Sequence, residues 1–400
     1  MMSGAKKMVP KRRFKEFLNA GDWEQRNLGD FVKIDTGKLD ANAMQEHGQY
    51  DFYTSGVQKY KIDCAAFEGP AITIAGNGAT VGYMHLADGL FNAYQRTYVL
   101  SQFTEDRQYL FYEIGRQLPK KIFKEARTGS IPYIVMDMLE SLQLSISTSQ
   151  ENKKIAQFLS FIDKTITLHQ RKLDKLQATK KALLQEMFPE EGQDKPKRRF
   201  KGFTDAWEQC KLSELATMNA RIGWQNLRTS EFLDSGDYLL ITGTDFDNGR
   251  IKYSTCHYVE KKRFDQDTKI QLSTGSILIT KDGTLGKVAL VEELPKPATL
   301  NAGVFNVRVK DDTLLSYKYL YHYLKAPFLM KYVTVNATGG TIKHLNQSIL
   351  VDFPIPIAEK HEQDKIAKLL DSIESIITLH QRKLDKLKNL KQAYLNEMFV

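Results

Sequence analysis

Two glycine-rich turns present polar side chains immediately after short apolar segments. The first follows Ala71–Ala75 and carries Asn77, and the second follows Ser276–Thr280 and carries Lys281 and Asp282. The glycine spacing fits neither the dinucleotide-binding pattern GxGxxG nor the phosphate-binding pattern GxxxxGKS/T. We therefore expect each turn to present its polar side chains to a partner instead of enclosing a nucleotide.

Patterns typical of catalysis or metal binding do not stand out in the sequence. We find no serine, histidine and aspartate order, no HExxH motif and no paired carboxylates. Cys64, Cys210 and Cys256 lie far apart without a CxxC pair, so neither a disulfide framework nor a cysteine zinc site is supported. The sequence thus predicts a binding protein without a metal site.

Composition limits the class of protein further. The chain has 400 residues, a net charge of +9 and a pI near 9.1, which fits a nucleic-acid partner but does not by itself establish one. No apolar run reaches the ~18 residues that a membrane span needs, and the N-terminus lacks an apolar signal core. We expect a cytoplasmic protein with no membrane partner.

The chain is internally duplicated. The eleven residues ITLHQRKLDKL occur at 166–176 and again, 211 positions later, at 377–387. The same shift relates Glu151 to Glu362. An opening motif, Lys11-Arg-Arg-Phe14 with Trp23-Glu-Gln25, recurs as Lys197-Arg-Arg-Phe200 with Trp207-Glu-Gln209. Two similar units predict a pseudo-symmetric molecule and a partner with a twofold axis of its own.

Each repeated segment predicts a long helix with a heptad seam, about 35 residues or ~50 Å in length. The apolar seam positions are Ile155, Leu159, Ile162, Ile166, Leu173 and Leu176, and then Ile366, Leu370, Ile373, Ile377, Leu384 and Leu387. His169, Lys180, His380 and Lys391 interrupt the seam. We interpret the two histidines as residues that set the register, because no metal-ligand set lies near them.

The polar breaks favour an antiparallel pair of helices. A parallel pair in register would bury Lys180 beside Lys391 and His169 beside His380. An antiparallel pair sets His169 near Leu384 and Lys180 near Ile373, where the lysine stem can reach outward to water.

The segments before the helices are predicted to be mixed α/β. Strand-like runs are Val32–Ile34, Ala71–Ala75, Thr97–Leu100, Tyr238–Thr242, Ser276–Thr280 and Val304–Val309. Asn92-Ala93 matches Asn301-Ala302, whereas most loops differ between the units. A shared scaffold with different loops suits two readers of two different targets.

The chain resembles the specificity subunit of type I restriction-modification systems over nearly its whole length. The resemblance rests on the two opening motifs, on the segment Gly340-Thr-Ile with Pro354-Ile-Pro356 and Glu362-Gln-Asp-Lys-Ile-Ala367, and on the helix ends at Phe188 and Phe399. The first unit departs from the pattern, with Ser147-Thr-Ser149 where the second has Ala358-Glu-Lys360.

The resemblance implies an α+β fold in which two target recognition domains are separated by two long helices that form an antiparallel coiled coil. The implied domains are 1–150 and 191–361, with the helices at 151–190 and 362–400. Each domain would read one half of a bipartite site in double-stranded DNA, while the helices set the spacing and dock two methyltransferase subunits. Restriction subunits are further implied partners. No cofactor is implied for this chain, since S-adenosylmethionine and ATP with Mg²⁺ would belong to the partner subunits.

Base-reading side chains should be polar or basic and lie on loops, because arginine or lysine suits guanine and asparagine or glutamine suits adenine. In the first unit the candidates are Lys38, Tyr53, Thr54, Ser55, Asn77, Asn92, Tyr94, Gln95, Arg96, Arg127 and Ser130. In the second they are Arg221, Trp224, Asn226, Arg228, Thr244, Lys281, Asp282, Asn301, Thr341, Lys343 and His344. We interpret Trp23 and Trp207 as core anchors.

Two alternatives stay open at this point. One is an enzyme that acts alone on nucleic acid, against which the missing methyltransferase, nuclease and NTPase motifs argue. The other is a coiled-coil scaffold without DNA specificity.

Overall fold

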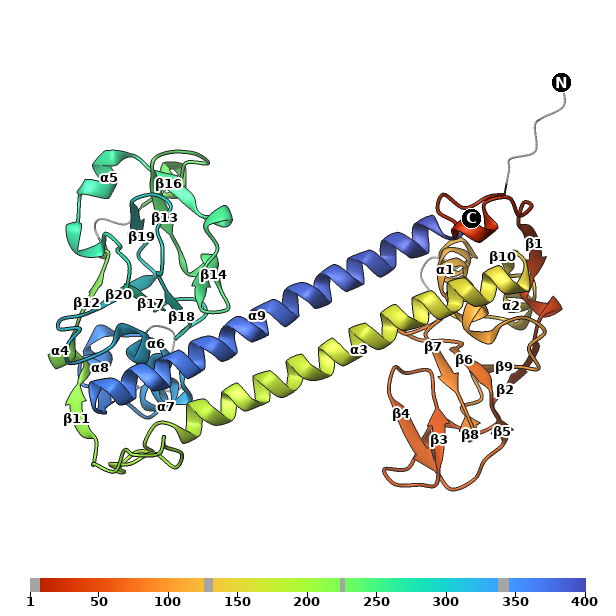
Figure 1. Ribbon diagram of the computed structural model, residues 1–400, viewed down its shortest axis with the longest axis horizontal. Coiled ribbons are helices and arrows are strands. Elements are labelled where there is room, and N and C mark those ends of the chain that lie inside the picture. The colour runs from red at the N-terminus through yellow and green to blue at the C-terminus, as the bar shows by residue number, and fades with distance from the viewer. Residues whose placement is uncertain (1–7, 126–131, 224–226, 337–344) are drawn as a thin grey trace. The chain divides into compact units, whose positions relative to one another are not determined.

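The structure is a computed structural model that describes residues 8–125, 132–223, 227–336 and 345–400. The chain divides into two compact units, one of residues 1–171 with 382–400 and one of residues 172–381. We call them the first and the second unit (Figure 1). The division runs through both long helices, so each unit takes part of both. The linear segments expected from the sequence therefore do not coincide with the compact units.

The first unit consists of small sheets, the helices α1 and α2, and its share of the long helices. Its strands are β1 (Glu24–Asn27), β2 (Lys33–Thr36), β3 (Tyr50–Tyr53), β4 (Lys59–Ile62), β5 (Phe67–Glu68), β6 (Ala71–Ala75), β7 (Met84–Ala87), β8 (Leu90–Ala93), β9 (Thr97–Ser101) and β10 (Gln143–Ile146). Its helices are α1 (Arg107–Glu125), α2 (Met136–Glu140) and the first part of α3 (Ser149–Glu186), with 3₁₀ turns at Lys15–Phe17, Leu28–Asp30 and Ala41–Ala43. The sheet orders are β2-β9-β6-β7, β4-β3-β8-β5 and β1-β10.

The second unit repeats this plan. Its strands are β11 (Glu208–Lys211), β12 (Ala216–Ala220), β13 (Tyr238–Ile241), β14 (Phe246–Asp247), β15 (Arg250–Ile251), β16 (His257–Val259), β17 (Ile277–Thr280), β18 (Val288–Leu290), β19 (Ala298–Leu300), β20 (Val304–Val309) and β21 (Pro354–Ile357). Its helices are α4 (Leu212–Leu215), α5 (Lys261–Asp265), α6 (Tyr317–Lys325), α7 (Pro327–Asn336), α8 (Gln347–Leu350) and the first part of α9 (Lys360–Glu397), with 3₁₀ turns at Thr229–Glu231, Gly243–Asp245, Tyr253–Thr255 and Thr268–Ile270.

Sheet topology shows the duplication directly. The order β12-β20-β17-β18 repeats β2-β9-β6-β7, β16-β13-β19 repeats β4-β3-β8, and β11-β21 repeats β1-β10. In both units the second sheet contains a parallel pair, β3 with β8 and β13 with β19. The duplicated sequence skeleton therefore encodes a duplicated fold.

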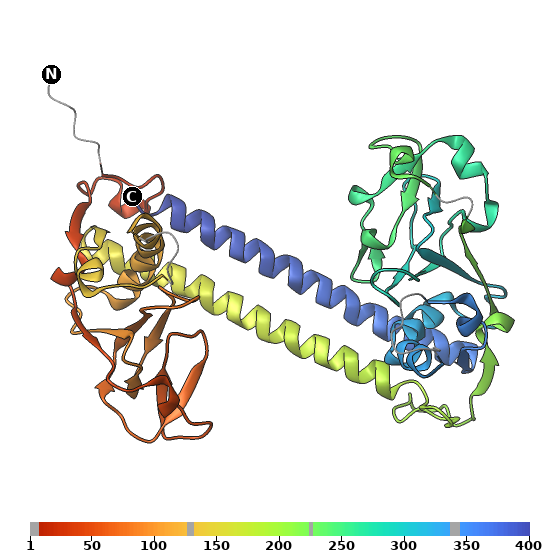
Figure 2. The same ribbon diagram turned by 180° about the vertical axis from the view of Figure 1, so that it is seen from behind.

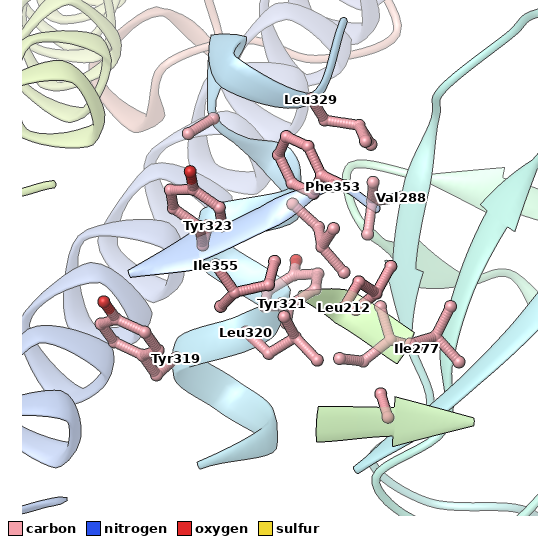
Figure 3. Packing of buried hydrophobic residues seen from close by; sticks show 14 of the residues in the cluster. Leu212, Ile277, Val288, Tyr319, Leu320, Tyr321, Tyr323, Leu329, Phe353 and Ile355 are labelled. Atoms are coloured by element: carbon pink, nitrogen blue, oxygen red, sulfur yellow. The ribbon is translucent and has the colours of Figure 1, made fainter. Parts of the chain in front are cut away.

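Each unit has its own apolar core. In the second unit α6 supplies Tyr319, Leu320, Tyr321 and Tyr323 to one apolar cluster with Phe353 and Ile355 (Figure 3). Helix α6 lies beside α9, because Lys318 and His322 of α6 bind Asp371 of α9 at 2.8 and 2.9 Å (Figure 1, Figure 2). Trp23 and Trp207 are only 3% and 4% exposed, which confirms the prediction that they anchor the cores.

The long helices lie antiparallel within each unit, as expected. In the first unit Asp163 of α3 binds Lys391 of α9 at 2.6 Å, and Phe158, earlier in α3, packs on Tyr394, later in α9. In the second unit Lys180 of α3 binds Glu374 of α9 at 2.6 Å. Eight of the twelve apolar seam residues are buried, whereas Ile166, Leu176, Ile377 and Leu387 are half-buried.

Lys180 differs from the expectation in one respect. Its side chain is 20% exposed and pairs with a carboxylate instead of extending into water. Glu374 also accepts from Lys325 of α6 at 2.6 Å. The charge of Lys180 is thus neutralised by Glu374 within the second unit. The heptad pattern could not predict this cluster, because its residues lie far apart in the sequence.

The opening motifs tie each unit to the ends of the helices. Arg13 binds Glu151 through Nε at 2.6 Å and Nη2 at 2.7 Å, and Arg12 binds Glu397 at 2.6 Å. The neighbouring turn has the same form in both units despite its different residues: two residues separate β10 from α3 and β21 from α9. Among the described residues no helix is long and apolar enough to cross a membrane.

Candidate nucleic-acid interface

Four loops of the first unit meet at one end of its sheets. Leu39 pairs with Tyr94 in a β-bridge, and the Tyr94 N–H donates to the Tyr53 carbonyl at 2.9 Å. The Ser55 hydroxyl donates to Asn77 Oδ1 at 2.7 Å. The Gly76 N–H donates to the Arg96 carbonyl at 2.8 Å. Candidates from four separate stretches of sequence are therefore brought together on one rigid edge.

Charge on this edge is basic. Lys38, Gln95 and Arg96 are exposed, while Ser55, Asn77 and Tyr94 are half-buried. The ion pairs of the described residues leave Lys38 and Arg96 without an acidic partner, whereas Lys59 and Lys61 both approach Asp51. Lys38 and Arg96 can thus offer their charge to an anion.

Some predicted residues of the first unit lie inside it. Tyr53, Thr54 and Asn92 are 2%, 9% and 3% exposed. Asn92 donates to the Cys64 carbonyl at 3.0 Å and accepts from the Ala93 N–H at 2.9 Å. Burial raises the pKa of the Tyr53 phenol. These contacts hold the loops together, and burial argues against Tyr53, Thr54 and Asn92 as base readers.

The second unit has the corresponding edge. The Asn301 N–H donates to the Ile241 carbonyl at 2.9 Å, and the Lys281 N–H donates to the Gly303 carbonyl at 2.9 Å. Thr244 and Asp282 are exposed, and Lys281 and Asn301 are half-buried. Asn301 Oδ1 accepts from the Ala302 N–H at 2.8 Å. The strand register sets Asn301 at the position of Tyr94, so the sequence match of Asn301 with Asn92 is wrong by two residues. The edge again gathers candidates from three loops.

Arg221 is a core residue by its contacts. It is 2% exposed, and its guanidinium donates to the Leu300 carbonyl at 2.8 Å and to the Thr299 hydroxyl at 3.2 Å. Desolvation lowers its pKa. Arg228, by contrast, is exposed. Seven candidates lie outside the described residues: Arg127, Ser130, Trp224, Asn226, Thr341, Lys343 and His344.

Sequence reasoning missed two exposed aromatic side chains near the first edge. Tyr83 follows the Gly82 turn and is 40% exposed, and Tyr133 is 51% exposed and forms a β-bridge with Asn77. Aromatic rings beside a basic edge can stack on bases or pack on sugars. Gly82, directly before Tyr83, could have indicated from the sequence that Tyr83 lies at an exposed turn.

Comparison with known proteins defines the class. The sequence matches the family described as the type I restriction modification DNA specificity domain twice, over residues 20–178 and 204–389. The chain therefore belongs to this family. This confirms the resemblance to specificity subunits, although Lys11–Phe14, Lys197–Phe200, Phe188 and Phe399 lie outside the matched residues. The family's role is DNA specificity without catalysis.

Individual relatives match different shares of the chain. It is 22% identical over 399 residues to the type I restriction enzyme MjaVIII specificity subunit of Methanocaldococcus jannaschii, covering 94% of this chain and 91% of that protein. It is 36% identical over 138 residues to the EcoDI specificity subunit of Escherichia coli, covering 34% and 30%. The crystal structure of a type I restriction-modification S subunit from M. genitalium superposes with a TM-score of 0.70 at 16% identity, covering 98% and 99% of the two chains. That likeness supports the α+β fold with two domains and long helices.

Proposed function

We propose that this chain is the DNA-reading subunit of a type I restriction-modification complex and that each unit reads one half of a bipartite site. The observation that carries the proposal is the repeated edge, on which the same main-chain contacts support different polar side chains. The first edge offers Lys38, Asn77, Gln95 and Arg96, and the second offers Thr244, Lys281, Asp282 and Asn301. Different side chains on one scaffold would read different bases.

The long helices supply the second part of the proposal, which is docking of two methyltransferase subunits. The identical segments Ile166–Leu176 and Ile377–Leu387 each expose one leucine, Leu168 at 66% and Leu379 at 52%. A surface that occurs twice with the same residues fits two copies of one partner. S-adenosylmethionine, ATP and the restriction subunits would then belong to the rest of the complex, in the cytoplasm where its DNA lies.

The experiment is selection of random duplexes by the complex assembled with its methyltransferase subunits, followed by mapping of the methylated adenines. We expect two short specific half-sites separated by an unspecific spacer of fixed length. A single continuous site, or binding without sequence preference, would contradict the proposal and would favour the scaffold alternative.

A further inference from the structure

One hydrogen-bonded residue pair at the edge of the sheet, which we call the node, contains a basic residue in both units. The basic residue precedes β9 in the first unit and follows β17 in the second. In the first unit β6 and β9 are antiparallel neighbours with Ala75 opposite Thr97, and in the second β17 and β20 pair with Thr280 opposite Val304. Just beyond these pairs Gly76 faces Arg96, and Lys281 faces Gly303. The glycine and the basic residue of this pair are therefore exchanged between the two units.

The main chain shows that the two nodes are equivalent. The N–H of Gly76 donates to the Arg96 carbonyl at 2.8 Å, as the N–H of Lys281 donates to the Gly303 carbonyl at 2.9 Å. The carbonyl of Gly76 accepts from Ile134 at 2.7 Å. The carbonyl of Lys281 accepts from Leu345 at 2.9 Å, and these donors are 211 positions apart, the shift of the sequence repeat.

Packing explains why position 76, directly after β6, does not carry the basic side chain in the first unit. A Cβ on Gly76 would lie 2.4 Å from the Arg96 carbonyl oxygen and 3.0 Å from the Tyr98 ring. In the second unit Phe305 takes the place of Tyr98 in the strand, and Lys281 Nζ lies 5.5 Å from the centre of its ring. Gly303 can accept a Cβ without a clash, since the nearest atoms, of Asp282, would lie at 3.7 Å.

Neither Arg96 nor Lys281 forms an ion pair with another described residue of its unit, although Lys281 lies over the Phe305 ring. Arg96 is exposed and Lys281 is half-buried. Many other basic side chains of the first unit are paired, such as Lys33 with Asp35 and Arg107 with Asp88. A cation held on a hydrogen-bonded node of a sheet edge, next to Asn77 or Asp282, is well placed to meet an anionic or acceptor group.

We propose that Arg96 and Lys281 are equivalent DNA-contacting residues, each serving the half-site of its own unit. The inference rests on the proposed function. The ligand is either a backbone phosphate or the O6 and N7 acceptors of guanine. A phosphate contact gives affinity that depends on salt, whereas a guanine contact gives discrimination at one base pair.

The test moves the basic side chain of the second unit from position 281 to position 303. In the assembled complex, Lys281→Gly with Asp282→Asn reproduces Gly76 and Asn77, and addition of Gly303→Arg reproduces Arg96. Lys310→Ala is the matched control, because it removes one exposed lysine just beyond the other end of β20. Binding is measured against salt on the selected site and on variants of each half-site, and unchanged thermal unfolding of each variant confirms folding.

We expect the double variant to lose affinity by about 5- to 100-fold at one base pair of the second half-site, for a guanine contact, or to lose about 0.9 from the salt slope on every duplex, for a phosphate contact. Addition of Gly303→Arg should restore most of a phosphate contact or change the preferred base at that position, and Arg96→Gly should act on the first half-site alone. A double variant no weaker than Lys310→Ala, or a loss that Gly303→Arg leaves untouched, would overturn the inference. If wild-type complex fails to select DNA at all, the proposed function itself fails.

Discussion

Arg199 and Glu362, 163 residues apart, are joined by two hydrogen bonds of 2.8 Å, from Nε and Nη2 of the guanidinium to the two carboxylate oxygens. Glu362 is fully buried, and the Trp207 indole N–H also donates to it at 3.1 Å. The hydrogen bond to Glu362 raises the pKa of Arg199. The first unit builds the same pair from Arg13 and Glu151, so each opening motif binds the start of a long helix.

Loss of this pair should be costly. Arg199→Ala leaves a buried carboxylate without its main partner, and we expect the free energy of unfolding to fall by about 3–5 kcal/mol. The matched control is Arg198→Ala, which removes an exposed pair with Glu186 and should cost about 1 kcal/mol or less. Urea unfolding of the purified chain measures both. An equal loss of unfolding free energy in the two variants would show that the buried pair stabilises the fold no more than the exposed pair.

The helix seam makes a second prediction. Leu159 and Leu370 are equivalent positions of the repeat, and both are fully buried. Each change to alanine should destabilise the chain by about 2–5 kcal/mol, because it removes packed atoms and leaves a cavity. Leu168→Ala, on the exposed face of α3, should stay within about 0.5 kcal/mol. A comparable loss from all three variants would mean that the seam is assigned wrongly.

The exposed leucines make a prediction about assembly. Leu168→Glu and Leu379→Glu leave the seam intact, so each single variant should fold normally and bind one methyltransferase subunit, and the double variant none. Native mass spectrometry counts the subunits. Two bound subunits in the double variant would place the docking surface elsewhere on the chain.

Stability should depend on pH through the charge cluster of the second unit. Burial lowers the pKa of Lys325 to about 8 from 10.5, with Glu374 opposing the shift. Between pH 8 and 10.5 the unfolded chain therefore holds a proton that the folded chain has lost, so this group makes stability rise with pH across that window. Other lysines, such as Lys318, have raised pKa values and act in the opposite direction. The contribution of Lys325 to the pH dependence of stability is therefore measured as a difference between the wild type and a Lys325 variant.

The comparison is urea unfolding of wild type and Lys325→Met at pH 8 and pH 10. Stability of the wild type should increase relative to the variant over this range, by an amount on the order of 2 kcal/mol. A difference between the two proteins that does not change with pH would contradict the lowered pKa.

Local sequence patterns predicted much of the fold. Ala71–Ala75 and Val304–Val309 are strands with the expected bounds, because an apolar run between turn residues has few other solutions. The heptad pattern predicted the two long helices, and its polar breaks predicted their antiparallel order. The parallel pairing of β3 with β8 could not be predicted, since it joins residues about 40 positions apart whose register depends on the packed core.

The candidate site was harder to read because residue type does not reveal burial. Asn92 and Arg221 have the chemistry of base readers, yet their polar atoms bond to carbonyls and neighbours in the interior. Lys38 and Arg96 look no different in sequence but lie on the surface. The exchange of Gly76 and Arg96 for Lys281 and Gly303 became visible only from the strand register.

The central claim is that the two units read independently. The most direct measurement is methylation mapping with a chimera in which residues 20–150 are replaced by those of a relative with a different first recognition segment. We predict that one half-site changes while the other half-site and the spacer length stay as in the wild type. A change in both half-sites, or a new spacer with both half-sites kept, would contradict independent reading on a fixed helical spacer.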